Sequence, residues 1–131
     1  MNIELINLRS TGALSFIEAQ RDIPFEIKRV YYIGSSPSDT HRGFHAHKTL
    51  KQLLFCPYGA VNIFLDNGVE QKTILLDKPD KGLLIFPVIW REMIWQTDSS
   101  ILFVLASDWY DEEDYIRDYE EYLGYLRGSI K

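Results

Sequence analysis

The sequence predicts an all-β domain, a sandwich or barrel, that ends in one short α-helix. Short apolar runs recur about every 8–12 residues and are separated by turn residues, which is typical of such folds. Only the segment from Asp111 onward repeats its apolar residues at helical spacing. Because 131 residues fit one domain with one hydrophobic core, we expect residues 1–131 to form a single domain.

The predicted strands occupy the chain from about residue 3 to residue 106. Asn67-Gly68 lies between two apolar runs and is the strongest short hairpin signal in the sequence. Pro57-Tyr58-Gly59 and residues 77–82 mark two further turns. The predicted strands are Ile3–Leu8, Ala13–Glu18, Lys28–Ile33, Gly43–His47, Lys51–Cys56, Ala60–Asp66, Val69–Leu76, Gly82–Phe86, Glu92–Gln96 and Ile101–Ala106.

A single helix is predicted over about residues 111–127. Its apolar stripe recurs at intervals of four, three and four residues, which places it on one helical face. Asp111 can cap the start, and the acidic residues that follow suit the positive end of the helix dipole. Arg127 and Gly128 are plausible stop signals. The stripe consists of Tyr115, Tyr119, Tyr122 and Leu126.

The formal net charge of the chain is −5, from 14 basic and 19 acidic residues. A nucleic-acid-binding protein normally carries a basic excess, so we expect no nucleic-acid partner. The acidity is local, because residues 108–122 hold eight acidic residues and one basic residue. The rest of the chain therefore carries a net charge of +2 and can offer arginines to an anionic small molecule.

The sequence also indicates a cytoplasmic protein that does not cross a membrane. No apolar run approaches the roughly 18 residues that span a bilayer. The first twelve residues lack the basic and apolar parts of a signal peptide. The single cysteine, Cys56, lies in an apolar run and can form no internal disulfide, which suits a reducing compartment.

All three histidines lie within seven residues, at positions 41, 45 and 47. Side chains alternate along a strand, so His45 and His47 are predicted to share one face and Ala46 to lie on the other. Two imidazoles on one face of a small β-domain are costly to bury without partners. The pair therefore indicates either metal ligation or acid–base catalysis near neutral pH.

The spacing around this pair resembles the motifs of metal-binding cupins, in which Glu follows H-x-H and a second motif with Gly and Pro supplies a third His. Here Gln52 stands at the carboxylate position, and Arg91 stands at the position of the third His. An arginine cannot ligate a divalent cation and repels it. We therefore expect no metal at this site, and the favoured chemistry is proton transfer on an anionic ligand.

From about Leu8 to Tyr122 the sequence resembles the sugar 3,4-ketoisomerases of the cupin superfamily. The stretches that carry the resemblance are IPFEIKRVYYI, RGFHAHK, the P-x-x-W segment and SDWYDEEDYI. The resemblance implies a cupin-type, RmlC-like antiparallel β-barrel or jelly roll that needs no metal or organic cofactor. It also implies a homodimer whose subunits exchange strands.

The same resemblance implies the substrate and the reaction. Members of this family act on a TDP-linked 4-keto-6-deoxyglucose and move its keto group from C4 to C3, in pathways to 3-amino-3,6-dideoxy sugars of surface polysaccharides. His45 and His47 match the family histidines and are the candidate base and proton shuttle. The predicted substrate-binding residues are Arg29, Tyr31, Tyr32, Arg42, Gln52 and Arg91.

Within that set, the arginines at positions 29 and 42 are the candidates for the diphosphate. Alternation along the strand allows only one of Tyr31 and Tyr32 to face the interior, where a phenol can pass a proton or bind sugar oxygens. The thymine ring needs a flat partner. The candidates for that partner are Trp95, Tyr58 and Trp90.

Two positions depart from relatives within the family. Arg91 follows the Trp of the P-x-x-W segment where several members have His, and Thr11 precedes Gly12 where some members carry Arg. A histidine can deliver a proton to C4, whereas an arginine can only orient groups or stabilise charge. We therefore predict a product of gluco configuration, with an equatorial hydroxyl at C4.

Two other functions stay open at this stage. A nucleotide-sugar 3,5-epimerase has a related barrel and substrate, but it pairs a His base with a Tyr acid on opposite faces of the sugar. The two histidines here share one strand face, which favours transfer between adjacent carbons. A non-catalytic sugar-binding cupin would bind the same ligand without turnover.

Overall fold

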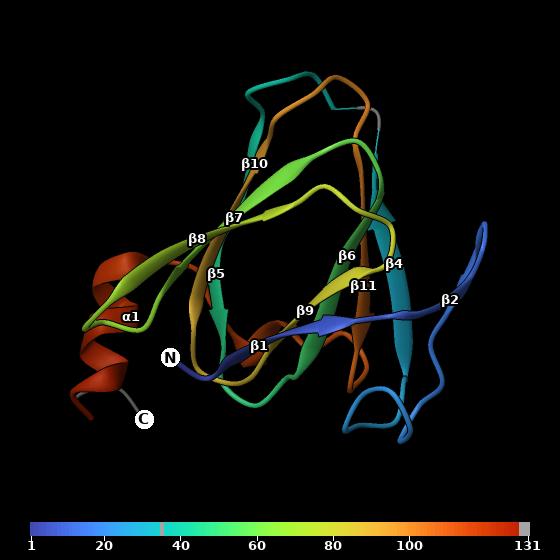
Figure 1. The fold of residues 1–131 in the computed structure, drawn as a ribbon. Helices are drawn as coiled ribbons and strands as arrows, with labels where there is room; N and C mark the ends of the chain where they lie inside the picture. Colours follow the sequence, from blue (N-terminus) through green and yellow to red (C-terminus); the bar gives the residue numbers. More distant parts are fainter. Residues whose placement is uncertain (35, 129–131) are drawn as a thin grey trace.

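The computed structural model describes residues 1–34 and 36–128. Residue 35 and residues 129–131, which end the predicted domain, lie outside the described residues. Two five-stranded antiparallel sheets face each other, and one short helix packs at the side of the second sheet (Figure 1). This arrangement confirms the predicted all-β class with a C-terminal helix.

Each sheet combines strands that are far apart in the sequence. The chain therefore passes back and forth between the two sheets, as in a jelly roll. The first sheet has the order β1 (Ile3–Asn7), β9 (Lys81–Ile85), β6 (Gln52–Tyr58), β11 (Ile101–Ala106) and β4 (Arg29–Ile33). The second has the order β12 (Tyr115–Ile116), β5 (His41–His47), β10 (Trp90–Trp95), β7 (Val61–Asp66) and β8 (Gln71–Leu76).

A small hairpin differs from the prediction near the N-terminus. The predicted strand Ala13–Glu18 is reduced to β3 (Leu14–Phe16), which pairs with β2 (Arg9–Thr11). The turn between them contains Gly12 at a φ of 62°, a conformation that glycine adopts without strain. The strand β2 was not predicted, because its short polar sequence has no apolar run.

The predicted helix over residues 111–127 is wrong in its first half. Residues Glu112–Asp114 form a 3₁₀ turn, η1, which the Asp111 side chain caps by accepting from the Glu113 N–H. The next two residues form β12, because their backbone pairs with His47 and Ala46 of β5. The helix α1 covers only Tyr119–Leu126 and is capped by Asp118. Sheet pairing therefore overrides the helical spacing of the first half.

The main core fills the space between the two sheets. On β10 the side chains of Met93 and Trp95 belong to this core, whereas Trp90 packs outward against α1 together with Tyr122. Strand alternation therefore gives each strand one interior face. The inward positions near one end of the sheets are occupied by polar side chains instead of apolar ones.

Candidate active site

Six of the predicted site residues meet in the interior between the sheets. They come from four strands: β4, β5, β6 and β10. His45 on β5 lies opposite Arg91 on β10 in the strand register, and hydrogen bonds join Arg91 to Gln52 and Gln52 to Tyr31. Sequence positions up to 62 apart thus contribute to one cluster. Its members are Arg29, Tyr31, His45, His47, Gln52 and Arg91.

The two histidines lie side by side on one face of β5. Their ring centroids are 4.9 Å apart in an edge-to-face arrangement, while Ala46 packs on the opposite side near α1. Gly43, at a φ of 93°, permits the close crossing of β5 and β10, since a Cβ there would lie 3.0 Å from the Arg91 carbonyl oxygen. A register shift between Arg91 and Glu92 accompanies this crossing. Such a bulge re-aims side chains.

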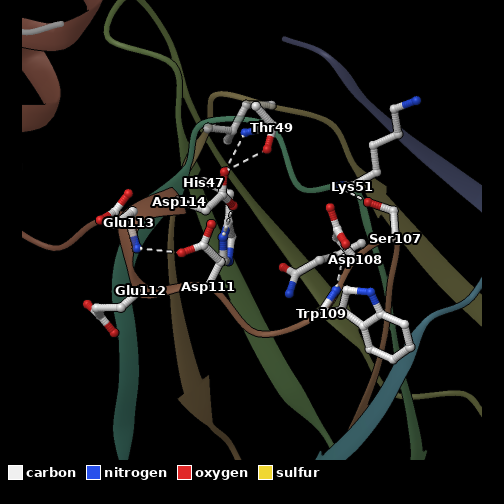
Figure 2. A network of polar contacts seen from close by, with 12 residues as sticks. His47, Thr49, Lys51, Ser107, Asp108, Trp109, Asp111, Glu112, Glu113 and Asp114 are labelled. Atoms are coloured by element: carbon white, nitrogen blue, oxygen red, sulfur yellow. Dashed lines mark hydrogen bonds and ion pairs between the residues drawn. The ribbon is translucent and has the colours of Figure 1, made fainter.

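The ring of His47 is held by Asp114, a residue near the C-terminal end of the described chain. Its Nδ1 lies 2.9 Å from Oδ2 of Asp114, and Oδ1 of the same carboxylate accepts hydrogen bonds from the N–H and the hydroxyl of Thr49 (Figure 2). His47 is completely buried, and its Nε2 has no hydrogen-bond partner among the described residues. Both ring nitrogens of His45 likewise lack a partner in that part of the chain.

Burial keeps both imidazoles neutral at physiological pH. Desolvation, followed by the positive charge of Arg91, lowers the pKa of His45 to about 4. The same two causes lower the pKa of His47 strongly. A neutral imidazole has one nitrogen with a free lone pair, so each ring can accept a proton.

A buried polar chain lies next to the histidines. The Arg91 guanidinium donates to the Gln52 side-chain oxygen and, at 3.1 and 3.2 Å, to the Ile89 carbonyl oxygen. The Gln52 amide in turn donates to the Tyr31 hydroxyl at 3.1 Å. Burial lowers the pKa of Arg91 to about 10, so it stays cationic at neutral pH, and burial raises the pKa of Tyr31. This chain supplies a fixed positive charge and an oriented phenol.

A cavity of about 410 Å³ opens onto His45. Its described lining includes three arginines, at positions 29, 42 and 117, and no carboxylate. The volume falls within the range of small-molecule sites, and guanidinium groups suit phosphate oxygens. Arg91 and Gln52 are not part of the lining and lie behind it. The cavity can therefore hold an anionic ligand against one histidine.

The structure does not bring every predicted residue to this cavity. Tyr32 points to the outer face of β4, stacks on Phe103 at 5.1 Å and does not line this cavity, so its role in substrate binding stays a prediction. Trp95 is buried in the main core, Trp90 is buried between β10 and α1, and Tyr58 is exposed at the end of β6. None of these three aromatic residues lines the cavity. Thr11 lies on the β2–β3 hairpin, also outside the lining.

Three site residues were missed because their segment was interpreted as helix. Asp114 contacts His47, Tyr115 stands with its ring centroid 4.4 Å from that of His47, and Arg117 lies over the Tyr115 ring at 4.1 Å. Tyr115 and Arg117 also line the cavity. The stretch SDWYDEEDYI contains Asp114 and Tyr115 and ends directly before Arg117, so this mark of the family was the signal that could have pointed to all three.

The donor set does not favour a metal ion. Among the described residues, no group of three or more His, Cys, Asp or Glu side chains is placed to hold one. In metal-binding cupins, a carboxylate stands at the position of Gln52 and a third histidine at the position of Arg91. Here the guanidinium of Arg91 instead donates a hydrogen bond to the Gln52 amide. A fixed cation at that point opposes binding of a divalent ion.

The facing sheets, the interior histidine pair and the arginine-lined cavity define a cupin-type protein with a site for an anionic small molecule. The family model described as "FdtA: WxcM-like, C-terminal" matches residues 1–127. The chain therefore belongs to this FdtA family of cupins.

Relatives in this family are sugar isomerases. The chain is 44% identical over 130 residues to TDP-4-oxo-6-deoxy-alpha-D-glucose-3,4-oxoisomerase of Aneurinibacillus thermoaerophilus, which covers 96% of this chain and 94% of that protein. It is 44% identical to a His-to-Asn variant of the 3,4-ketoisomerase QdtA from Thermoanaerobacterium thermosaccharolyticum, solved with TDP-4-keto-6-deoxyglucose. That match has a TM-score of 0.92 and covers 97% and 95% of the two chains.

A third relative, the TDP-quinovose 3,4-ketoisomerase WlaRB of Campylobacter jejuni, is 43% identical, with a TM-score of 0.87 and coverage of 93% and 97%. The predicted enzyme class, a sugar 3,4-ketoisomerase, is confirmed by these relatives. The RmlC epimerase of Mycobacterium tuberculosis, 18% identical with a TM-score of 0.61 over 70% of this chain and 50% of that one, shows the RmlC-like fold alone. Among the described residues, no helix is long and apolar enough to span a membrane.

Proposed function

We propose that the protein moves the keto group of TDP-4-keto-6-deoxyglucose from C4 to C3, with His45 as the base. The observation that carries the proposal is the position of His45, whose neutral ring borders the arginine-lined cavity and has no hydrogen-bond partner among the described residues. His47 is the weaker candidate for direct contact, because it is completely buried and is not part of the lining.

The chemistry follows from the acidity of the hydrogen on C3, next to the C4 ketone. A nitrogen of His45 takes this proton, the C3–H electron pair forms a C3–C4 double bond, and the carbonyl pair moves to the C4 oxygen. The proton of the C3 hydroxyl passes to the C4 oxygen. Return of the proton from His45 to C4 leaves the ketone at C3. General acid–base catalysis of this kind contributes roughly 10²–10⁴-fold in rate.

The surrounding charges support each step. Arg29 and Arg42 border the cavity and are assigned to the diphosphate. Their cations would fix the nucleotide part of the substrate while the sugar lies against His45. The buried charge of Arg91 favours the enediolate, and Tyr31, oriented by Gln52, can carry the proton between the sugar oxygens. A bound dianion also raises the proton affinity of His45, which eases its role as base.

The gluco configuration of the product is part of this proposal. Arg91 holds the position where a histidine proton donor stands in other members, and its guanidinium is engaged by Gln52 and Ile89. An arginine leaves proton delivery at C4 to the face that His45 occupies. The 43% identity with a TDP-quinovose isomerase supports the same assignment, since quinovose has the gluco configuration. An NMR spectrum of the product showing an axial C4 hydroxyl would contradict it.

The test of the reaction is incubation of the purified protein with TDP-4-keto-6-deoxyglucose in deuterated buffer. A ketone at C3 supports the ketoisomerase, with deuterium at C4 to the extent that the imidazolium of His45 exchanges its proton with solvent before returning it. Exchange at C5 would instead indicate a 3,5-epimerase, and binding with neither a shifted ketone nor exchange would indicate a sugar-binding protein. Either of these two results would overturn the proposal.

A homodimer with exchanged strands completes the proposal. The outer face of β4 exposes Val30 at 55% and Tyr32 at 66%, and exposed apolar side chains of this kind suit a subunit interface. Light scattering during size-exclusion chromatography should give about twice the mass of the chain. We also propose a cytoplasmic role in the supply of 3-amino-3,6-dideoxy sugars to surface polysaccharides, which rests on family resemblance.

A further inference from the structure

The contact between Asp114 and His47 has no part in the reaction described above. All three hydrogen bonds to the Asp114 carboxylate come from neighbours on or next to β5. Oδ1 accepts from the N–H and the hydroxyl of Thr49, each at 2.8 Å. Oδ2 lies 2.9 Å from Nδ1 of His47. An ionised carboxylate only accepts hydrogen bonds, so Nδ1 must be the nitrogen of His47 that carries the proton.

This assignment leaves the other nitrogen with its lone pair. A neutral imidazole protonated at Nδ1 has an unprotonated Nε2. In His47 this atom is fully buried and lacks a hydrogen-bond partner among the described residues. The ring stands 4.9 Å from that of His45 between centroids. Asp114 therefore determines which ring nitrogen of His47 is the hydrogen-bond acceptor.

The backbone holds Asp114 in place opposite His47. The N–H of Lys48 donates to the Asp114 carbonyl oxygen at 2.9 Å, and the next residue, Tyr115, pairs with His47 in the strand register. We refer to residues 111–117 as the C-terminal strap. The strap therefore fixes the carboxylate through main-chain contacts, in addition to the bonds from Thr49 that Figure 2 shows.

We propose that Asp114 is a positioning residue for the isomerase, which fixes the tautomer and the orientation of His47 so that Nε2 is an acceptor beside His45. This inference rests on the proposed function for its effect on turnover, but the tautomer itself does not depend on any substrate. A carboxylate behind a histidine has this effect wherever the histidine must present one chosen nitrogen.

The test is the substitution Asp114→Asn. In the unmodified protein, Thr49 donates its backbone N–H to Oδ1 of Asp114. In the variant, the asparagine must therefore direct its amide oxygen to Thr49 and its NH₂ to His47. His47 must then accept at Nδ1 and carry its proton at Nε2. Nitrogen-15 NMR of histidine-labelled protein, with only three histidines to assign, distinguishes these two tautomers.

We expect the Nδ1–H tautomer of His47 in the unmodified protein and the Nε2–H tautomer in the variant. We expect kcat to fall roughly 10–100-fold in the variant, with KM changed by less than about threefold. The matched control is Asp111→Asn in the same strap, because asparagine caps as well as aspartate and this residue does not contact His47. It should keep both the tautomer and kcat.

An Nε2–H tautomer of His47 in the unmodified protein would overturn the inference. So would a switched tautomer with an unchanged kcat, or a loss of folding stability in Asp114→Asn without a change of tautomer. If the tautomers behave as expected while the unmodified protein does not isomerise the sugar, the proposed function fails and the positioning of His47 by Asp114 stands.

Discussion

Arg91 donates a hydrogen bond to the side-chain oxygen of Gln52, and both side chains are buried. The amide of Gln52 then donates to the Tyr31 hydroxyl. One neutral side chain therefore connects a buried cation with a phenol on the cavity wall. Glutamine is suited to this bridge because it offers an acceptor at one atom and a donor at the next.

Replacing Gln52 by methionine should destabilise the fold. The change leaves the Arg91 guanidinium short of an acceptor in the interior, which costs roughly 1–3 kcal/mol of unfolding free energy. Urea unfolding at neutral pH measures this difference. The matched control is Gln96→Met, since Gln96 is exposed and its side-chain amide donates to the carbonyl oxygen of the neighbouring Ile94 rather than to a buried charged group. Equal unfolding free energies for the two variants would contradict the bridge.

Restoring the cupin ligand pattern should create a metal site. The double variant Gln52→Glu with Arg91→His removes the buried cation and adds two ligands near His45 and His47. We expect it to bind about one Zn²⁺ per chain after dialysis, and the unmodified protein to bind none in stoichiometric amount. Atomic emission spectroscopy measures the amount of zinc bound per chain. A further His45→Ala change should abolish the zinc, and retention of zinc there would place the metal elsewhere.

Replacing His45 by asparagine should remove turnover while the substrate still binds. Loss of the base predicts a kcat at least about 100-fold lower, with the Kd for TDP changed little because the arginines remain. Product formation followed by NMR and calorimetric titration with TDP measure the two quantities. His41→Asn, on the same strand with an exposed side chain, is the control and should keep full activity. Comparable turnover in both variants would exclude His45 as the base.

The unfolding free energy should fall as the pH is lowered from about 6.5 to about 4. An unfolded chain binds a proton at His45 near pH 6.5, while the folded protein resists this until about pH 4. The stability lost through His45 is therefore nil well above pH 6.5 and grows by at most about 1.4 kcal/mol per pH unit below it, and His47, whose pKa is also lowered, adds a loss of the same sign. Burial is the main cause of this lowered pKa; the positive charges of Arg91 and Arg117 lower it further, and the negative charge of Glu112 opposes them.

His45→Asn should therefore weaken the pH dependence of stability. Urea unfolding at about pH 7 and about pH 5 gives the slope for each protein, and His41→Asn removes an exposed imidazole as the comparison. A slope for His45→Asn as steep as that of the unmodified chain would show that the native His45 takes up its proton as readily as the unfolded one.

Replacing Arg42 by glutamine should weaken the binding of TDP. Loss of one cation that borders the cavity predicts at least about a tenfold higher Kd and a weaker dependence of binding on salt concentration. Calorimetry at two salt concentrations measures both. Arg21→Gln is the control, because Arg21 is exposed and lies outside the cavity lining. An unchanged Kd for Arg42→Gln would remove this residue from the diphosphate site.

The sequence predicted the strands and the strand-borne part of the site well, because these depend on local alternation. His45 and His47 share a face since they are two residues apart on one strand, and Tyr31 faces inward while Tyr32 faces outward for the same reason. The cupin motifs implied that Gln52 and Arg91 belong to one site, but the hydrogen bond between them was not predicted. It depends on how strands of the two sheets face each other across the interior, and local alternation does not encode that.

The C-terminal strap shows where prediction from local patterns fails. Tyr115 has the spacing of a helical stripe with Tyr119 and Tyr122, yet it lies on a strand. Its backbone pairs with β5, and its ring packs on both histidines. These contacts join residues nearly 70 positions apart, so their stabilising effect is invisible in a sequence window. Propensity predicts an element only where no such long-range pairing competes with it.

The pairing of β12 with β5 has a consequence for synthesis of the protein. Strands β1 to β11 precede residue 112 in the chain and make every pairing of the two large sheets except that of β12 with β5. Until the strap is synthesised, the part of the cavity wall that Tyr115 and Arg117 form does not exist. During that interval His47 has no carboxylate partner. The nascent chain thus gains its fold first and its histidine geometry only when the strap emerges. Emergence of the strap, rather than formation of the core, is the moment at which the site becomes complete.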